Sequence, residues 1–232
     1  MPLINSVKRY LTKCVNPKEV ILLCGFGGAV WQTKRLRTVL NRAGYNVTAL
    51  DFSKRVLSKG DPTLLPKLVE EVVIFAEEEA KKTDEKILLI GISLGSLLSL
   101  NIFRRTKAFD KAIMITGGNI VTVAQNIYGD KVWPQGNQEL SEAWKDLNIF
   151  TDPKLLSGKH ALFVLPTKDT LIDTSEVVSE IETQLNAGNN VLLVKRNSFG
   201  HIGTIIEETI LFPRRILDYI EKVEASSVSR PK

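Results

Sequence analysis

Short apolar runs alternate along the chain with longer stretches in which apolar side chains recur at helical spacing. Gly, Asn, Asp or Pro bound most of the apolar runs. These runs cover residues 19–24, 46–51, 86–92, 111–116, 160–165 and 190–195. Short runs that are apolar nearly throughout are typical of strands buried on both faces of a parallel sheet. We therefore expect each run to form a strand of such a sheet.

The stretches between the runs have the pattern of amphipathic helices. Apolar residues in one of them follow the i, i+3, i+4, i+7 spacing, namely Leu65, Leu68, Val69, Val72 and Ala76. The predicted helices lie near 31–42, 65–76, 94–106, 175–186 and 202–220, and Pro213 is expected to kink the last. Because parallel strands need crossover helices, the alternation predicts an α/β fold with a doubly wound, mostly parallel six-stranded sheet.

One interval, 119–159, interrupts this alternation. It is far longer than the dozen or so residues that a crossover needs, and it contains Tyr128, Trp133 and Trp144. Insertions of this length are usually functional or disordered, and the aromatic residues argue against disorder. We interpret the interval as a small lid over an apolar pocket; the alternative is a set of extra helices that cover the sheet. The lid would belong to a single domain spanning 1–223, and the polar residues 224–232 are expected to form a flexible tail.

Composition narrows the class of protein. The chain has 232 residues, of which 44% are apolar and 25% charged, so disordered, collagen-like and coiled-coil proteins are excluded. Cys14 and Cys24 provide neither a disulfide framework nor a zinc-ligand spacing, which favours a reducing compartment. The first 13 residues have Lys8, Arg9 and Lys13 but no apolar core, so we do not expect them to form a secretory signal. No apolar stretch of the sequence is long enough to span a membrane. We expect a cytoplasmic protein without a membrane span.

The positive charge is modest and dispersed along the sequence. The formal net charge is +5, and the basic residues form small separate groups at 34–37, 104–107 and 214–215. A nucleic-acid-binding protein is expected to gather such residues on one face, with aromatic residues among them. We interpret the groups as solvated surface and expect no nucleic-acid partner.

A G-x-S-x-G sequence at Gly91–Gly95 directly follows the apolar stretch 86–90 and precedes a predicted helix. Small residues on both sides of a serine permit the sharp strand-to-helix turn that lifts a nucleophilic hydroxyl above the sheet. Ser93 is therefore the candidate nucleophile, and the Leu94 N–H at the helix start is a candidate oxyanion donor. The alternative is an ordinary strand–helix turn with Ser93 as an N-cap.

A serine nucleophile needs a base, and the chain has two histidines. His201 lies between the last predicted strand and the last predicted helix, at the sheet edge where Ser93 is also expected. His160 begins a strand at the opposite edge and is better explained as a structural residue. His201 is therefore the candidate base, with a helix-cap or surface role as the alternative.

The base in turn needs a carboxylate to orient it. Asp169 follows the fifth predicted strand on a turn, whereas Asp173 precedes a predicted helix and is suited to capping it. We favour Asp169 over Asp173 as the orienting residue. The chain order Ser, Asp, His is that of α/β-hydrolases and differs from the orders in chymotrypsin and subtilisin.

The first predicted strand ends in a glycine-rich turn, Cys24–Gly28. The N–H of Phe26 is a candidate second oxyanion donor there. A dinucleotide-binding turn, with Asp51 holding a ribose, is disfavoured because Val30 occupies a position that requires Gly or Ala. A tight turn without a further role is the third interpretation.

These motifs together resemble the α/β-hydrolase superfamily. CGFGG, GISLGS, PTKDTLID and SFGHIG occur in the family order, and the resemblance extends from about Glu19 to Val223. It implies that Ser93 is the nucleophile, His201 the base and Asp169 its orienting carboxylate, with oxyanion donors at the two positions named above. The chain departs from the family in having Cys24 where a histidine often precedes the oxyanion glycine. It also has few residues before the first predicted strand, which implies a trimmed sheet of six parallel strands.

The resemblance implies a serine hydrolase that cleaves a carboxylic ester or thioester through an acyl-enzyme. Tyr128, Trp133 and Trp144 favour a small-molecule substrate with an apolar acyl or aromatic group. Neither a metal nor an organic cofactor is expected, and the sequence carries no signal of oligomeric state. The alternatives are a small-ligand-binding or signalling protein on the same fold, or a regulator whose lid docks a partner. The complete set of Ser93, Asp169 and His201 disfavours both alternatives.

Overall fold

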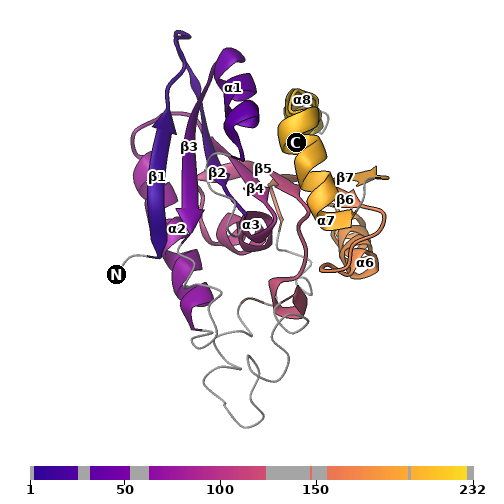
Figure 1. Ribbon diagram of the computed structural model, residues 1–232. Coiled ribbons are helices and arrows are strands. Elements are labelled where there is room, and N and C mark those ends of the chain that lie inside the picture. Colours follow the sequence, from indigo (N-terminus) through magenta and orange to yellow (C-terminus); the bar gives the residue numbers. More distant parts are fainter. Residues whose placement is uncertain are drawn as a thin grey trace.

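The computed structural model describes residues 3–25, 32–52, 63–123, 147, 156–197 and 200–228. Its centre is a seven-stranded sheet in the order β1-β3-β2-β4-β5-β6-β7, with helices on both faces (Figure 1). Six of the strands run parallel to one another: β2 (Lys18–Leu23), β3 (Tyr45–Phe52), β4 (Ile87–Ile92), β5 (Phe109–Ile115), β6 (His160–Pro166) and β7 (Asn190–Arg196). The α/β class and the six predicted strands are therefore confirmed.

The helices follow the predicted positions closely. In the described residues they are α1 (Lys34–Arg42), α2 (Leu64–Ala80), α3 (Leu94–Arg105), α6 (Thr174–Asn186), α7 (Gly200–Ile206), the π-helical turn η3 (Glu207–Leu211) and α8 (Arg215–Val228). Each predicted crossover helix buries its apolar stripe against the sheet, which is why sequence periodicity locates it well. No helix in the described part of the chain is both long and apolar enough to cross a membrane.

The prediction of six all-parallel strands was wrong at the N-terminus. A seventh strand, β1 (Ile4–Tyr10), pairs antiparallel with β3 at the edge of the sheet. Lys8 and Arg9 in its second half are exposed, as is common in edge strands, where charge discourages pairing with other chains. Because β1 is neither continuously apolar nor strictly alternating, its sequence lacks the signal that identified the buried strands.

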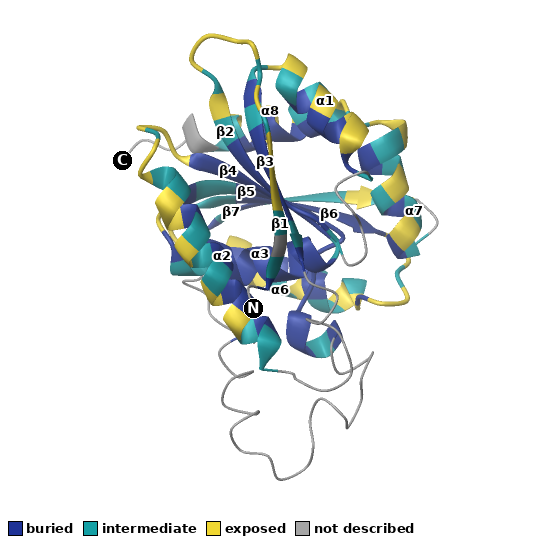
Figure 2. Ribbon diagram, turned by 60° about the vertical axis from the view of Figure 1, so that its left-hand side comes forward, coloured by how far each residue is buried: buried dark blue, intermediate teal, exposed yellow. Residues whose placement is uncertain are grey.

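The two faces of the sheet are covered by different helices. On one face, α2, α3 and α6 contribute Leu68, Leu98 and Val177 to the larger apolar core. On the other, α1 and α8 contribute Leu36 and Tyr219 to a second core. Figure 2 shows the buried strands between these layers, with exposed residues on the outer sides of the helices. The layers hold the strand ends, and hence the site, in fixed positions.

The last predicted helix is interrupted where Pro213 was expected to disturb it. The π-helical turn η3 ends at Leu211, and α8 begins only at Arg215. The carboxylate of the buried Glu208 accepts a hydrogen bond from Arg196 Nε at 2.7 Å, which ties η3 to β7. Beyond the break, α8 continues to Val228, so residues 224–228, expected in the tail, are helical.

Candidate active site

Three strands deliver the candidate catalytic residues to one edge of the sheet. Ser93 follows β4 directly, Asp169 lies on the turn after β6, and His201 lies in α7 soon after β7. These strands are parallel, so their carboxyl ends meet at the same edge, where α/β proteins place their ligands. Residues that are far apart in the sequence are thereby brought together.

Ser93 occupies a strained backbone conformation between β4 and α3, with φ 53° and ψ −119°. Non-glycine residues rarely adopt a positive φ, and such strain is typical of functional turns. The flanking glycines permit the turn: a Cβ on Gly95 would lie 2.2 Å from the carbonyl oxygen of Leu23, and one on Gly91 would lie 2.2 Å from Oγ of Ser99. The chain therefore makes a sharp, strained and closely packed turn at Ser93, between β4 and α3.

Ser93, His201 and Asp169 form a continuous hydrogen-bonded chain. Oγ of Ser93 lies 2.8 Å from Nε2 of His201, and Nδ1 of the same imidazole lies 3.0 Å from Oδ2 of Asp169. The His201 side chain is 6% exposed and that of Asp169 is fully buried. This geometry suits an imidazole that donates Nδ1–H to the carboxylate and accepts the serine proton at Nε2.

The Asp169 carboxylate is fixed from both sides. Its Oδ1 accepts hydrogen bonds from the backbone N–H groups of Leu171, at 2.8 Å, and Ile172, at 3.1 Å. Burial works to raise the pKa of Asp169, but the hydrogen bonds from His201 and these N–H groups outweigh it and hold the pKa below its usual value. The charged form, which orients an imidazole, is therefore favoured. Sequence analysis did not single out Leu171 and Ile172, although an aspartate on a turn commonly binds the N–H groups that follow it.

Asp173, the alternative carboxylate, has a different role in the structure. Its Oδ1 accepts hydrogen bonds from the N–H groups of Ser175 and Glu176 and so caps the N-terminus of α6. The same oxygen also accepts a hydrogen bond from the Ser175 hydroxyl, and this bond contributes most to lowering the pKa of Asp173. Asp169 is thus the carboxylate that contacts His201, and Asp173 is a helix cap.

The two histidines lie in different environments. His201 is buried and follows Gly200, whose φ of +70° sets the start of α7. His160 begins β6, where its Nδ1 lies 3.1 Å from Oγ of Ser226 in α8. His160 is therefore a contact between β6 and α8, at the opposite end of the strand from Asp169.

Of the two candidate oxyanion donors, Leu94 lies within the described residues. Leu94 is the first residue of α3, and first-turn N–H groups of a helix have no partner within the helix. A Cβ on Gly25 would lie 3.1 Å from Cβ of Ser93, so the backbone just before Phe26 passes close to the serine. Phe26 itself lies outside the described residues.

Cys24, which stands where the family often has histidine, is buried at the end of β2. Burial raises the pKa of its thiol to about 12, so the thiolate is strongly disfavoured. Its N–H donates to the carbonyl of Leu50 at 3.1 Å. The buried, neutral thiol acts as a small apolar residue at the end of β2 rather than as a reactive group.

The expected substrate-binding residues Tyr128, Trp133 and Trp144 lie outside the described residues, as does most of the expected lid. Within that interval, Leu147 and Leu156 are buried in the larger apolar core. The carbonyl of Leu147 accepts a hydrogen bond from Asn101 Nδ2 at 3.3 Å. Across the described ranges, no group of three or more His, Cys, Asp or Glu side chains is placed to hold a metal ion.

Comparisons with known proteins identify the fold. No protein-family model and no curated protein sequence matches this chain. Many solved structures match this chain. The three that follow are at most 20% identical to it, so they establish the fold alone.

An esterase from Pyrococcus furiosus is 20% identical, with a TM-score of 0.65 over 89% of this chain and 82% of the esterase. A carboxylesterase from Bacillus cereus is 18% identical, with a TM-score of 0.62 over 94% of this chain and 93% of the other. Est1E from Butyrivibrio proteoclasticus, solved with ferulic acid, is 15% identical, with a TM-score of 0.69 over 95% of both chains. The protein therefore has the α/β-hydrolase fold.

Proposed function

We propose that the protein is a serine hydrolase that cleaves a carboxylic ester or thioester of a small-molecule substrate. The observation that carries this proposal is the hydrogen-bonded chain Ser93–His201–Asp169 beside a strained serine turn. The same residue types in this order and on this fold perform acyl transfer. The esterases among the structural neighbours support ester chemistry by analogy of fold.

In the proposed acylation step, Oγ of Ser93 attacks the acyl carbon while Nε2 of His201 removes the hydroxyl proton. Asp169 holds the imidazole in the tautomer that has a free Nε2 and stabilises the imidazolium that forms. The negative charge on the former carbonyl oxygen is received by the N–H of Leu94 and, on the sequence prediction, that of Phe26. His201 then protonates the leaving alkoxide or thiolate, leaving an ester on Ser93.

In the proposed deacylation step, His201 removes a proton from water as the water attacks the Ser93 ester. The tetrahedral intermediate uses the same N–H donors, and its collapse returns the proton from His201 to Oγ of Ser93. The product is a carboxylate. An apolar acyl or aromatic substrate remains our expectation, based on Tyr128, Trp133 and Trp144.

Pre-steady-state kinetics test this mechanism directly. With a short-chain p-nitrophenyl ester, we expect a burst of p-nitrophenol equivalent to the enzyme, together with an acyl adduct on the intact protein by mass spectrometry. Ser93→Ala should lose both. Ser179→Ala, on the exposed side of α6, serves as a matched control and should keep both. A folded wild-type protein that shows neither signal with ester or thioester substrates would contradict the proposal and favour the ligand-binding alternative.

A further inference from the structure

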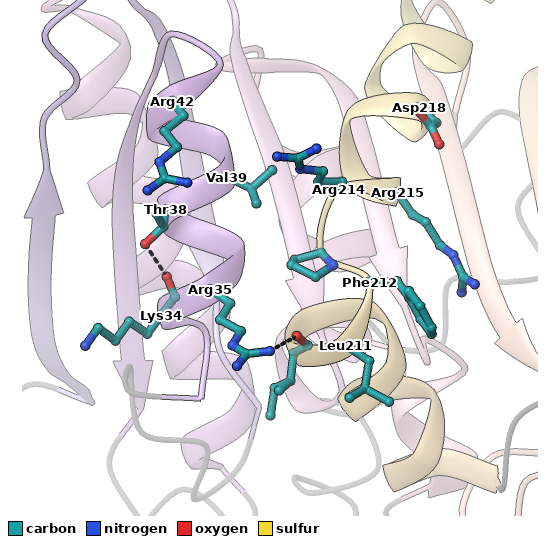
Figure 3. Close-up of a pocket in the computed structure, with 12 residues that line it drawn as sticks. Lys34, Arg35, Thr38, Val39, Arg42, Leu211, Phe212, Arg214, Arg215 and Asp218 are labelled. Carbon is teal, nitrogen blue, oxygen red and sulfur yellow. Dashed lines mark hydrogen bonds between the residues drawn. The ribbon is translucent and has the colours of Figure 1, made fainter.

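A groove of about 630 Å³ lies on the face of the sheet that α1 and α8 cover, which is the face opposite α3. It runs between α1 and the turn that joins η3 to α8 (Figure 3). Two of the basic groups that are far apart in the sequence meet in it: Lys34 and Arg35 from α1, and Arg214 and Arg215, which lie just before α8 and at its first residue. The fold thus concentrates charge that the sequence disperses. None of the residues that line the groove belongs to the candidate active site.

The charge in the groove is largely unmatched. Its lining has five cationic side chains, namely Lys34, Arg35, Arg42, Arg214 and Arg215, against the single carboxylate of Asp218. Arg215 is neutralised by Glu207 and Glu208, and Arg35 donates to the carbonyl of Ile210 at 3.1 Å. Within the described parts of the chain, Lys34, Arg42 and Arg214 form no ion pair. Gathered like charges repel one another, and a bound anion relieves that repulsion.

Apolar side chains lie directly beside these cations. Val39 faces the groove from α1, and Leu211, Phe212 and Pro213 line it from the opposite side. Leu211 is 57% exposed and Phe212 50% exposed, which is a high exposure for large apolar residues. Figure 3 shows Arg214 extending across the groove toward Val39, so charged and apolar surfaces converge in one place.

We propose that this groove binds a small amphipathic anion, a single apolar chain or ring system that carries a phosphate or carboxylate. The acidic group pairs with Arg214 and its cationic neighbours, and the apolar part packs against Leu211 and Pro213. The volume of the groove falls within the range of about 300–1,000 Å³ that is usual for small-molecule sites. A nucleic acid instead needs a row of phosphate contacts along an extended face, so we favour the small ligand.

Calorimetric titration with dodecyl phosphate and with dodecanoate, each kept below its micelle concentration, tests the site and separates the two acidic groups. We expect saturable binding of at least one of them and much weaker binding of the neutral dodecyl maltoside. The affinity should fall as ionic strength rises from about 0.05 to about 0.5 M, because charges in an open groove are screened. Equal binding of the neutral detergent, or no binding of either anion, overturns the proposal.

Variants locate the binding. The double variant Lys34→Glu/Arg214→Glu should bind the anion about tenfold more weakly or worse. It should still fold, because both new carboxylates lie next to helix N-termini, where a negative charge is stabilising. Leu211→Ser should weaken the binding of dodecyl phosphate while leaving that of inorganic phosphate unchanged. The matched control Lys67→Glu/Lys107→Glu makes the same change in net charge at exposed positions outside the groove and should bind normally. Unchanged affinity in the groove variants would overturn the proposal. So would a wild-type protein that binds anionic vesicles but neither free amphiphile, or one that binds an oligonucleotide more tightly than dodecyl phosphate.

Discussion

Oγ of Ser93 lies 2.8 Å from Nε2 of His201, although 108 positions separate the two residues in the sequence. The contact is made by two parallel strands that end at the same edge, and the strained serine turn directs the hydroxyl toward the imidazole. A proton can therefore pass between the two side chains without rearrangement of the backbone. The proposed chemistry depends on this contact.

Removal of either partner should abolish turnover. Ser93→Ala and His201→Ala are each expected to lower kcat by about 10⁴-fold or more, because a nucleophile and its base act as a unit. The circular dichroism spectrum and the thermal midpoint should stay close to those of the wild type. The double variant should be no worse than either single variant. Activity near that of the wild type in either single variant would contradict the assignment.

The two carboxylates on the turn after β6 should separate function from stability. Asp169→Asn should reduce kcat by about 10²- to 10⁴-fold, because it removes the group that fixes the tautomer of His201. Asp173→Asn retains a capping oxygen, so we expect kcat within about twofold of the wild type and little loss of stability. Kinetics and urea unfolding of both variants test this difference. A larger loss of kcat in Asp173→Asn than in Asp169→Asn would reverse the assignment.

The lowered pKa of Asp169 predicts a pH dependence of stability. A carboxyl whose pKa is lower in the folded than in the unfolded protein stabilises the fold above the unfolded pKa, which for aspartate is 3.8. This contribution is lost as the pH falls through the lower, folded value. The difference in unfolding free energy between wild type and Asp169→Asn should therefore shrink as urea titrations move from pH 7 toward pH 3. A difference that grows in acid would contradict the hydrogen bonding described for Asp169.

Because the turn at Ser93 is closely packed, one added methyl group at Gly95 should strongly destabilise the fold. In Gly95→Ala the new Cβ would lie 2.2 Å from the backbone oxygen of Leu23, so β2 or α3 must shift. We expect a loss of about 2 kcal/mol or more in unfolding free energy, together with loss of activity. In Gly158→Ala, the control, the new Cβ meets nothing within 4 Å, and only its φ of +71° adds strain. Its cost should be about 1 kcal/mol, without a change in kcat.

The six parallel strands and the crossover helices could be predicted because burial inside a sheet demands apolar runs such as 87–92, and even the edge strand β7 keeps an apolar run at 191–194. The edge strand β1 could not, since a strand of this kind tolerates Lys8 and Arg9 and has no apolar run. The end of α8 was also missed. Within 224–228, Glu224 forms an ion pair with Lys18 and Ser226 contacts His160, and the sequence pattern does not show these tertiary contacts.

At the candidate site, residue types and strand ends were enough to bring Ser93, Asp169 and His201 to one edge. The sequence pattern contained no information on which N–H groups bind Asp169, because this depends on the path of the turn after β6. It also did not reveal that Lys34 and Arg214 share a groove, because their proximity arises from the packing of α1 against η3. Features that depend on tertiary packing require the structure.

Labelling with a fluorophosphonate probe, followed by peptide mass spectrometry, tests the central claim most directly, because the probe reacts with a serine only when a base and an oxyanion site activate it. We predict one adduct per chain, located on Ser93, absent in Ser93→Ala, greatly slowed in His201→Ala and unchanged in Ser179→Ala. An unlabelled Ser93 in the folded wild-type protein, or equal labelling of the wild type and Ser93→Ala, would contradict the account.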